Sequence, residues 1–132
     1  MSDFQRDMQK EALLPILLGD SFAAHSLSLQ IYLRCGVRSY ICDSKRGFLS
    51  FIDPTSRFFD LISVSEGAAM LCALENIAAN TDYLPILVPC GERFCAFVEE
   101  NIEFLEPRFI IASKNNVFDS APFSAILKGG GA

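Results

Sequence analysis

The side chains best suited to chemistry in this chain lie in short polar segments that directly follow apolar runs. These segments supply carboxylates, hydroxyls, a thiol and basic groups, and the single histidine lies shortly after the first of them. Such groups can hold a small polar ligand, so we predict a substrate-binding role for them and assign no catalytic residue or metal ligand. The candidate residues are Gly19, Asp20, Ser21, His25, Asp43, Lys45, Arg46, Cys90, Gly91 and Glu92.

The turn at Gly19 precedes a predicted helix, where backbone N–H groups favour anions. A dinucleotide fingerprint would need further glycines where this chain has Ser21 and Ala24, and the carboxylate of Asp20 would repel a phosphate. Asp43 lies near the place of a ribose-binding acid, but no Walker motif follows Gly19. The pattern favours a capped strand–helix turn, with nucleotide binding as the alternative.

Histidine and cysteine offer few routes to catalysis here. One histidine and scattered cysteines do not have the spacing of a metal site. A nucleophilic pair would require Cys90 and His25 to meet across the sheet edge. For His25 the sequence favours a helix residue bonded to a neighbouring loop, and for Lys45 and Arg46 a solvated turn, over contacts with a ligand.

Apolar runs and helical patterns alternate along the chain. This alternation predicts an α/β fold of three layers: a mostly parallel, Rossmann-like sheet of about five strands with helices on both faces. In such a sheet, ligands bind beyond the carboxyl ends of the strands, where the candidate residues lie. The predicted strands are 14–18, 37–42, 58–64, 84–89 and 108–112; the helices are 22–35, 68–80 and 91–105; and 48–52 is a short strand or helical turn.

The length of 132 residues predicts one folded domain, with 51% hydrophobic residues to build its core. We expect an N-terminal helix or arm over 1–13, the α/β domain over 14–127 with one more helix at 120–127, and a flexible tail at 128–132.

The net charge of −5 argues against nucleic acid as a partner. No apolar run is long enough for a membrane span. Five cysteines without a paired spacing suit reduced thiols, so we expect a cytoplasmic protein.

Three segments carry a resemblance to a known family. They are Leu14–Ser21, with the helix and the strand to Asp43 behind it; Leu84–Phe94, an apolar strand with a proline and a polar turn; and Asn101–Ile111, a helix followed by a strand. In this order and spacing, residues 14–112 resemble the start of ATP-grasp carboxylate–amine ligases of the D-aspartate ligase type.

The resemblance implies a non-catalytic pre-ATP-grasp domain, in which Gly19, Asp20, Ser21 and the turn 90–92 face the substrate cleft. It implies that ATP and Mg²⁺ bind only to later ATP-grasp domains, that this chain holds no cofactor, and that it is not active alone. The partners would be those domains in cis or a second copy, with a small carboxylate or amino acid as substrate. Exposed apolar residues would mark the interface, at Phe48, Phe51, Phe118 and Phe123. The alternatives are a stand-alone binding domain for a small molecule or nucleotide, or a homo-oligomeric interaction module.

Overall fold

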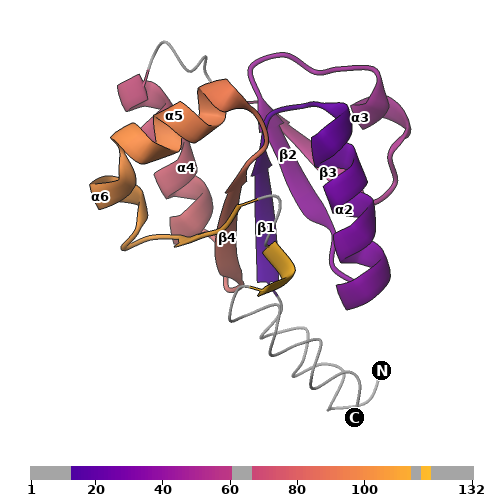
Figure 1. The fold of residues 1–132 in the computed structure, drawn as a ribbon. Coiled ribbons are helices and arrows are strands. Elements are labelled where there is room, and N and C mark those ends of the chain that lie inside the picture. The colour runs from indigo at the N-terminus through magenta and orange to yellow at the C-terminus, as the bar shows by residue number, and fades with distance from the viewer. Residues whose placement is uncertain (1–12, 61–66, 114–116, 120–132) are drawn as a thin grey trace, which may run out of the picture.

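The computed structural model describes residues 13–60, 67–113 and 117–119, in which strands and helices alternate as the sequence predicts (Figure 1). The predicted helix at 120–127, the tail and all but the last residue of the predicted arm lie outside these ranges. The elements are β1 (Leu13–Leu18), α2 (Phe22–Cys35), β2 (Ser39–Asp43), α3 (Leu49–Ile52), β3 (Ser56–Asp60), α4 (Gly67–Ala79), β4 (Leu84–Pro89), α5 (Glu92–Glu100), α6 (Ile102–Leu105), β5 (Ile110–Ile111) and the 3-10 turn η1 (Val117–Asp119).

The five strands form one parallel sheet in the order β3-β2-β1-β4-β5, which confirms the predicted Rossmann-like class. The chain moves outward from β1 to β3 and then returns to place β4 on the other side of β1. Leu18, at the end of β1, pairs with Cys42 of β2 and Pro89 of β4. The loops after these three strands therefore leave the sheet at one level, which we call the carboxyl edge.

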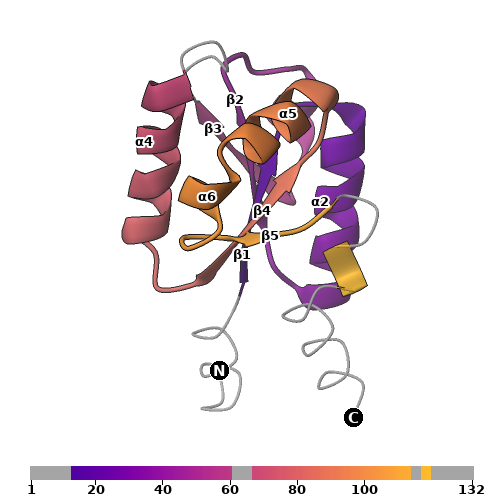
Figure 2. The ribbon, with the colours of Figure 1, turned by 60° about the vertical axis from the view of Figure 1, so that its left-hand side comes forward.

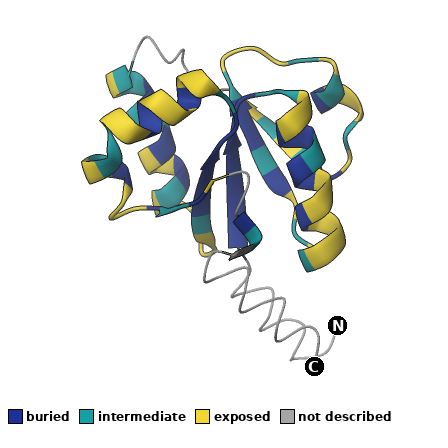
Figure 3. Cartoon of the chain, in the orientation of Figure 1, coloured by how far each residue is buried: buried dark blue, intermediate teal, exposed yellow. Residues whose placement is uncertain are grey.

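Helices cover both faces of the sheet (Figures 1 and 2). Every residue of β1 is buried, as expected for a central strand covered on both sides (Figure 3). Its side chains alternate between two cores. Leu14, Ile16 and Leu18 pack in a core with residues of α4, α5 and α6, and Leu13 and Leu17 pack in a core with residues of α2 and η1.

Both ends of α2 form as the sequence predicts. The hydroxyl of Ser21 accepts the backbone N–H of Ala24 at 3.2 Å, so Ser21 is the N-cap. Gly36 follows the last turn with a φ of 69° and donates its N–H to the carbonyl of Tyr32 at 2.8 Å. These two caps fix where the helix begins and ends, and Ser21 thereby joins α2 to the carboxyl edge.

The predicted continuous helix over 91–105 is wrong at one position. Asn101 leaves helical geometry, and its side-chain amide donates to the carbonyl of Phe97 at 2.8 Å. This local hydrogen bond competes with the backbone ladder and divides the segment into α5 and α6.

The ends of several predicted strands also shift. The N–H groups of Arg108 and Phe109 donate to the carbonyl of Leu105, so the chain continues the end of α6 there and the last strand shortens to β5. The second strand begins at Ser39 rather than residue 37. The third begins at Ser56, two residues before the predicted start. The ambiguous segment 48–52 contains a short helix, α3.

No helix in the described parts of the chain has the length and apolar character needed to cross a membrane. None of the five cysteines forms a disulfide. Burial raises the pKa of the Cys42 thiol far above its usual value, so this side chain is a neutral part of the core.

Candidate functional site

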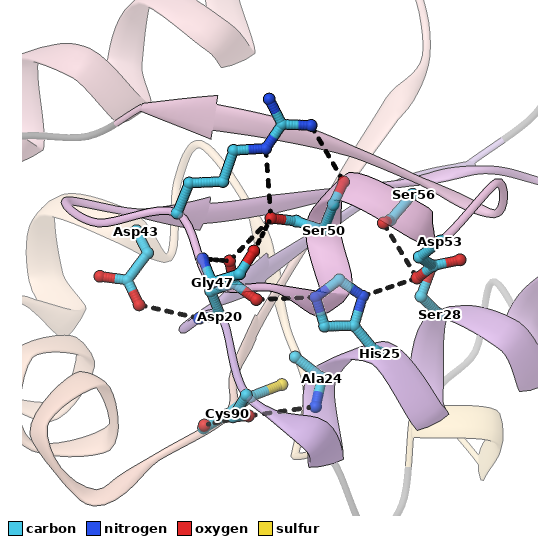
Figure 4. Close-up of polar contacts among 12 residues, drawn as sticks. Asp20, Ala24, His25, Ser28, Asp43, Gly47, Ser50, Asp53, Ser56 and Cys90 are labelled. Atoms are coloured by element: carbon cyan, nitrogen blue, oxygen red, sulfur yellow. Dashed lines mark hydrogen bonds and ion pairs between the residues drawn. The ribbon is translucent and has the colours of Figure 1, made fainter.

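His25 is the centre of a buried polar cluster at the carboxyl edge (Figure 4). Its Nε2 atom lies 2.7 Å from Oδ1 of Asp20, and its Nδ1 atom lies 2.6 Å from Oδ2 of Asp53. The three side chains are 7%, 3% and 12% exposed, respectively. A ring nitrogen must carry a proton to donate to a carboxylate, so two such contacts fit the imidazolium form of the ring.

Asp20 connects three segments of the chain. Its second carboxylate oxygen accepts the backbone N–H of Gly47 and, at 3.0 Å, the hydroxyl of Ser50. Its own backbone N–H donates to Oδ2 of Asp43 at 2.8 Å. The turn after β1 is therefore held against the segment that follows β2.

Asp53 continues the cluster on the other side of the imidazole. One carboxylate oxygen accepts the backbone N–H of Thr55 at 2.8 Å and its hydroxyl at 2.6 Å. The other accepts the hydroxyl of Ser56 at 3.0 Å as well as His25. Asp53, Thr55 and Ser56 are not among the residues predicted from the sequence. The segment Asp53-Pro54-Thr55-Ser56 nevertheless has the composition of a turn whose aspartate bonds its own backbone.

The two aspartates remain carboxylates at neutral pH despite their burial. Burial alone would raise the pKa of Asp20, but hydrogen bonds from Gly47, His25 and Ser50 outweigh it and lower that pKa. Burial acts on Asp53 in the same way, and bonds from His25 and Thr55 reverse it, so its pKa is also lowered. The two carboxylates therefore keep their negative charges where they face the two ring nitrogens of His25.

This cluster should make the fold sensitive to acid. Because both pKa values lie below the usual 3.8, the carboxylates stabilise the folded state above about pH 4, and this stabilisation is lost as the pH falls through the folded values. We expect the free energy of unfolding, measured in urea across this range, to fall more steeply in the wild type than in the D20N/D53N variant. If the free energy of unfolding falls equally steeply with pH in both proteins, Asp20 and Asp53 do not have lowered pKa values in the folded state.

The geometry suits positioning better than proton transfer. In a catalytic triad the serine donates to the histidine, whereas here Ser50 donates to Asp20, and both ring nitrogens of His25 face aspartates. The thiol of Cys90 donates to the carbonyl of Val88, so the Cys90–His25 pair considered above is replaced by other contacts. Among the described residues, no group of three or more His, Cys, Asp or Glu side chains could hold a metal ion.

The loops after β1 and β4 meet beside this cluster. The hydroxyl of Ser21 lies 3.5 Å from the carbonyl oxygen of Cys90. Gly19 has a φ of 113°, and a Cβ atom there would lie 3.1 Å from the same oxygen and 3.3 Å from the ring of Phe94. Dinucleotide-binding folds bring a pyrophosphate to this point, between the central strands. Here a carbonyl and an aromatic ring lie against the glycine.

The remaining candidate residues have different surroundings. The guanidinium of Arg46 donates to the hydroxyl and carbonyl of Ser50 and lies 4.0 Å from the ring centroid of Phe51. It therefore supports α3. Lys45 and Glu92 are exposed, and Gly91 is the N-cap residue of α5.

A separate hollow lies between α4 and α5. It combines the first turn of α4 with one side of α5, and it shares no residue with the cluster around His25. Its described lining consists of Gly67, Ala68, Leu71, Arg93, Ala96, Phe97, Glu100 and Asn101.

The fold and the cluster together define a Rossmann-like α/β domain. At its carboxyl edge, buried contacts of Asp20, His25 and Asp53 join the segments that follow β1 and β2. Comparisons of the chain with protein-family models, with curated proteins and with solved structures found no match.

Proposed function

We propose that this chain is a non-catalytic domain of an ATP-grasp-type carboxylate–amine ligase, which contributes loops to a substrate cleft and packs against ATP-grasp domains outside these 132 residues. The proposal follows the resemblance of residues 14–112 to the first domain of such ligases. In it, the turn 19–21 and the turn 90–92 form one side of the cleft, and ATP with Mg²⁺ belongs to the other domains.

The observation that carries the proposal is an apolar patch beside the carboxyl edge. We define the α3 patch as Phe48, Phe51 and Ile52, which are 76%, 65% and 61% exposed. The same segment turns its polar groups inward, since Gly47 and Ser50 donate to Asp20. The cluster around His25 therefore fixes an apolar surface at the rim of the loops, where a second domain would close a cleft.

Of the two other aromatic residues named from the sequence, Phe118 does not extend this patch. Phe118 packs against the core on the α2 side of the sheet, where the guanidinium of Arg34 lies 4.3 Å from its ring centroid. Phe123 lies outside the described residues. The patch thus rests on α3 and the residue before it.

We expect this chain alone to bind no ATP–Mg²⁺ at micromolar concentration, because the proposal assigns nucleotide binding to other domains. Isothermal titration with ATP and Mg²⁺ measures this, and micromolar binding would overturn the proposal. The DNA downstream of the codon for Ala132 gives an independent test. The proposal requires ATP-grasp domains in the same reading frame, and a reading frame without them would contradict it.

The hollow between α4 and α5 favours a second candidate, a stand-alone domain that binds a small carboxylate. Arg93 and Glu100 place one positive and one negative charge at its wall, so the carboxylate of a ligand would bind at Arg93. A thermal-shift screen of amino acids and small carboxylates separates the two candidates, because a bound ligand stabilises the folded state. A shift that disappears in R93A would favour the second candidate over the first.

A further inference from the structure

The solvent-facing side of α2 carries a row of apolar side chains. Phe22 is 79% exposed, Leu29 is 47% exposed and Leu33 is 72% exposed. With Ser26, these positions repeat at intervals of four, three and four residues, so they form one stripe along a helix of 3.6 residues per turn. We call these four residues the α2 stripe, which lies opposite the face that α2 buries against the sheet.

This composition is unusual for the outer side of a helix that faces only water. Such faces are normally charged or polar, because burial of the opposite face already provides the packing energy. Between Phe22 and Leu33 the only titratable group that can carry a positive or negative charge near neutral pH is His25, which is buried in the cluster. The helix α5 shows the ordinary pattern, with four charged residues exposed. These are Glu92, Arg93, Glu99 and Glu100.

We propose that the α2 stripe pairs with the α2 stripe of a second copy of this chain, in antiparallel orientation about a two-fold axis. A two-fold interface requires a surface that is complementary to itself. The intervals of four, three and four read the same in both directions, so an antiparallel copy presents matching positions. The same intervals separate the core positions of paired helices in coiled coils.

The side chains are complementary in this register. Phe22 faces the partner's Leu33 at each end of the pair, and Ser26 faces the partner's Leu29 in the middle. The small serine leaves room for a leucine, as knob-into-hole packing between helices requires. Two apolar contacts at the ends and two small–large contacts in the centre thus cover the stripe.

The distribution of charge permits a second copy at this face. The chain has a net charge of −5, so two copies repel each other through most of their surfaces. Three exposed residues beside the stripe are uncharged: Ala23 and Gln30 on one side and Tyr32 on the other. This face therefore allows two copies to approach with little local repulsion. One helix pair covers less than the about 800 Å² per partner of a standard interface, so we expect a weak dimer.

Analytical ultracentrifugation of the full chain over a range of concentrations tests the proposal. We expect a reversible monomer–dimer equilibrium, and we expect L33K to raise the dimer dissociation constant by about 100-fold, because a charge replaces a buried leucine in both copies. Circular dichroism checks that the variant folds. L84K is the matched control, since Leu84 is 45% exposed on β4 and lies off the stripe; it should leave the constant unchanged.

A mixing experiment tests the orientation. F22E and L33K should each be monomeric alone, and an equimolar mixture should recover the dimer, because antiparallel pairing brings the opposite charges together at one end and keeps Phe22 against Leu33 at the other. In a parallel pair, mixing would only remove like-charge repulsion and would leave each charge against an apolar side chain, so the dimer would not be recovered to the wild-type level. A monomeric wild type, a dimer unaffected by L33K, or a mixture that stays monomeric would overturn the proposal. The α2 stripe shares no residue with the α3 patch, so the outcome is independent of the proposed function.

Discussion

Replacement of His25 with alanine should lower the free energy of unfolding by about 3–5 kcal/mol, as expected when one partner of a buried ion pair is removed. The substitution removes the imidazole ring that lies between the carboxylates of Asp20 and Asp53, so each carboxylate loses a buried partner. Both side chains are at most 12% exposed, so water can replace the lost contacts only if the structure opens. Denaturant unfolding at neutral pH measures the loss.

Two further comparisons distinguish the stability that comes from the contacts of His25 with the aspartates from the stability of the helix α2 itself. Q30A changes an exposed residue of the same helix and should alter the free energy of unfolding by less than about 0.5 kcal/mol. In a D20N/D53N background the charges are already absent, so H25A should cost less there than in the wild type, which a double-mutant cycle measures as coupling. Equal costs in the two backgrounds would mean that His25 stabilises the fold by packing alone.

The second large effect is expected at Gly19, which G19A should destabilise by about 2–4 kcal/mol. Its φ of 113° is strained for any residue with a side chain, and the added Cβ would lie 3.1 Å from a backbone oxygen of Cys90 that cannot move independently. The substitution would push the loop after β1 away from the loop after β4. Thermal or denaturant unfolding measures the loss.

Gly36 provides the matched comparison for backbone strain. It also has a positive φ, of 69°, but an added Cβ meets no atom within 4 Å. G36A should therefore cost only about 1 kcal/mol, the strain of a left-handed residue without a steric clash. If both variants lose the same stability, the close contact between the two loops contributes nothing.

Much of the fold could be predicted because local signals and tertiary structure agree. Ser21 and Gly36 bound α2 as their capping chemistry indicates, and β4 has the predicted boundaries because Leu84–Pro89 is a short apolar run between polar turns. By contrast, the division of the predicted helix 91–105 depends on a single contact. Asn101 bonds its own helix through a side chain, and helical periodicity carries no information about such a bond.

The site was predicted in part for a similar reason. Asp20, Asp43 and His25 follow or adjoin predicted strand ends, so the topology alone brings them to one edge. Asp53 comes from a turn with an uncertain prediction, and its bond to His25 spans 28 residues of sequence. Its local turn signal was visible, but only the packing of α3 against α2 shows that the carboxylate reaches the imidazole.

The central position of β1 has a consequence for how the domain can form during synthesis. β1 pairs along its full length with β4, and the contact between Ser21 and Cys90, beyond the ends of these strands, spans 69 residues. Until β4 leaves the ribosome, one side of an entirely apolar strand has unpaired backbone groups that other chains can join. Closure over so long a segment is also slow compared with helix formation. We therefore expect aggregation to compete most strongly with folding in the period before β4 is synthesised, while β1 lacks one of its two neighbouring strands.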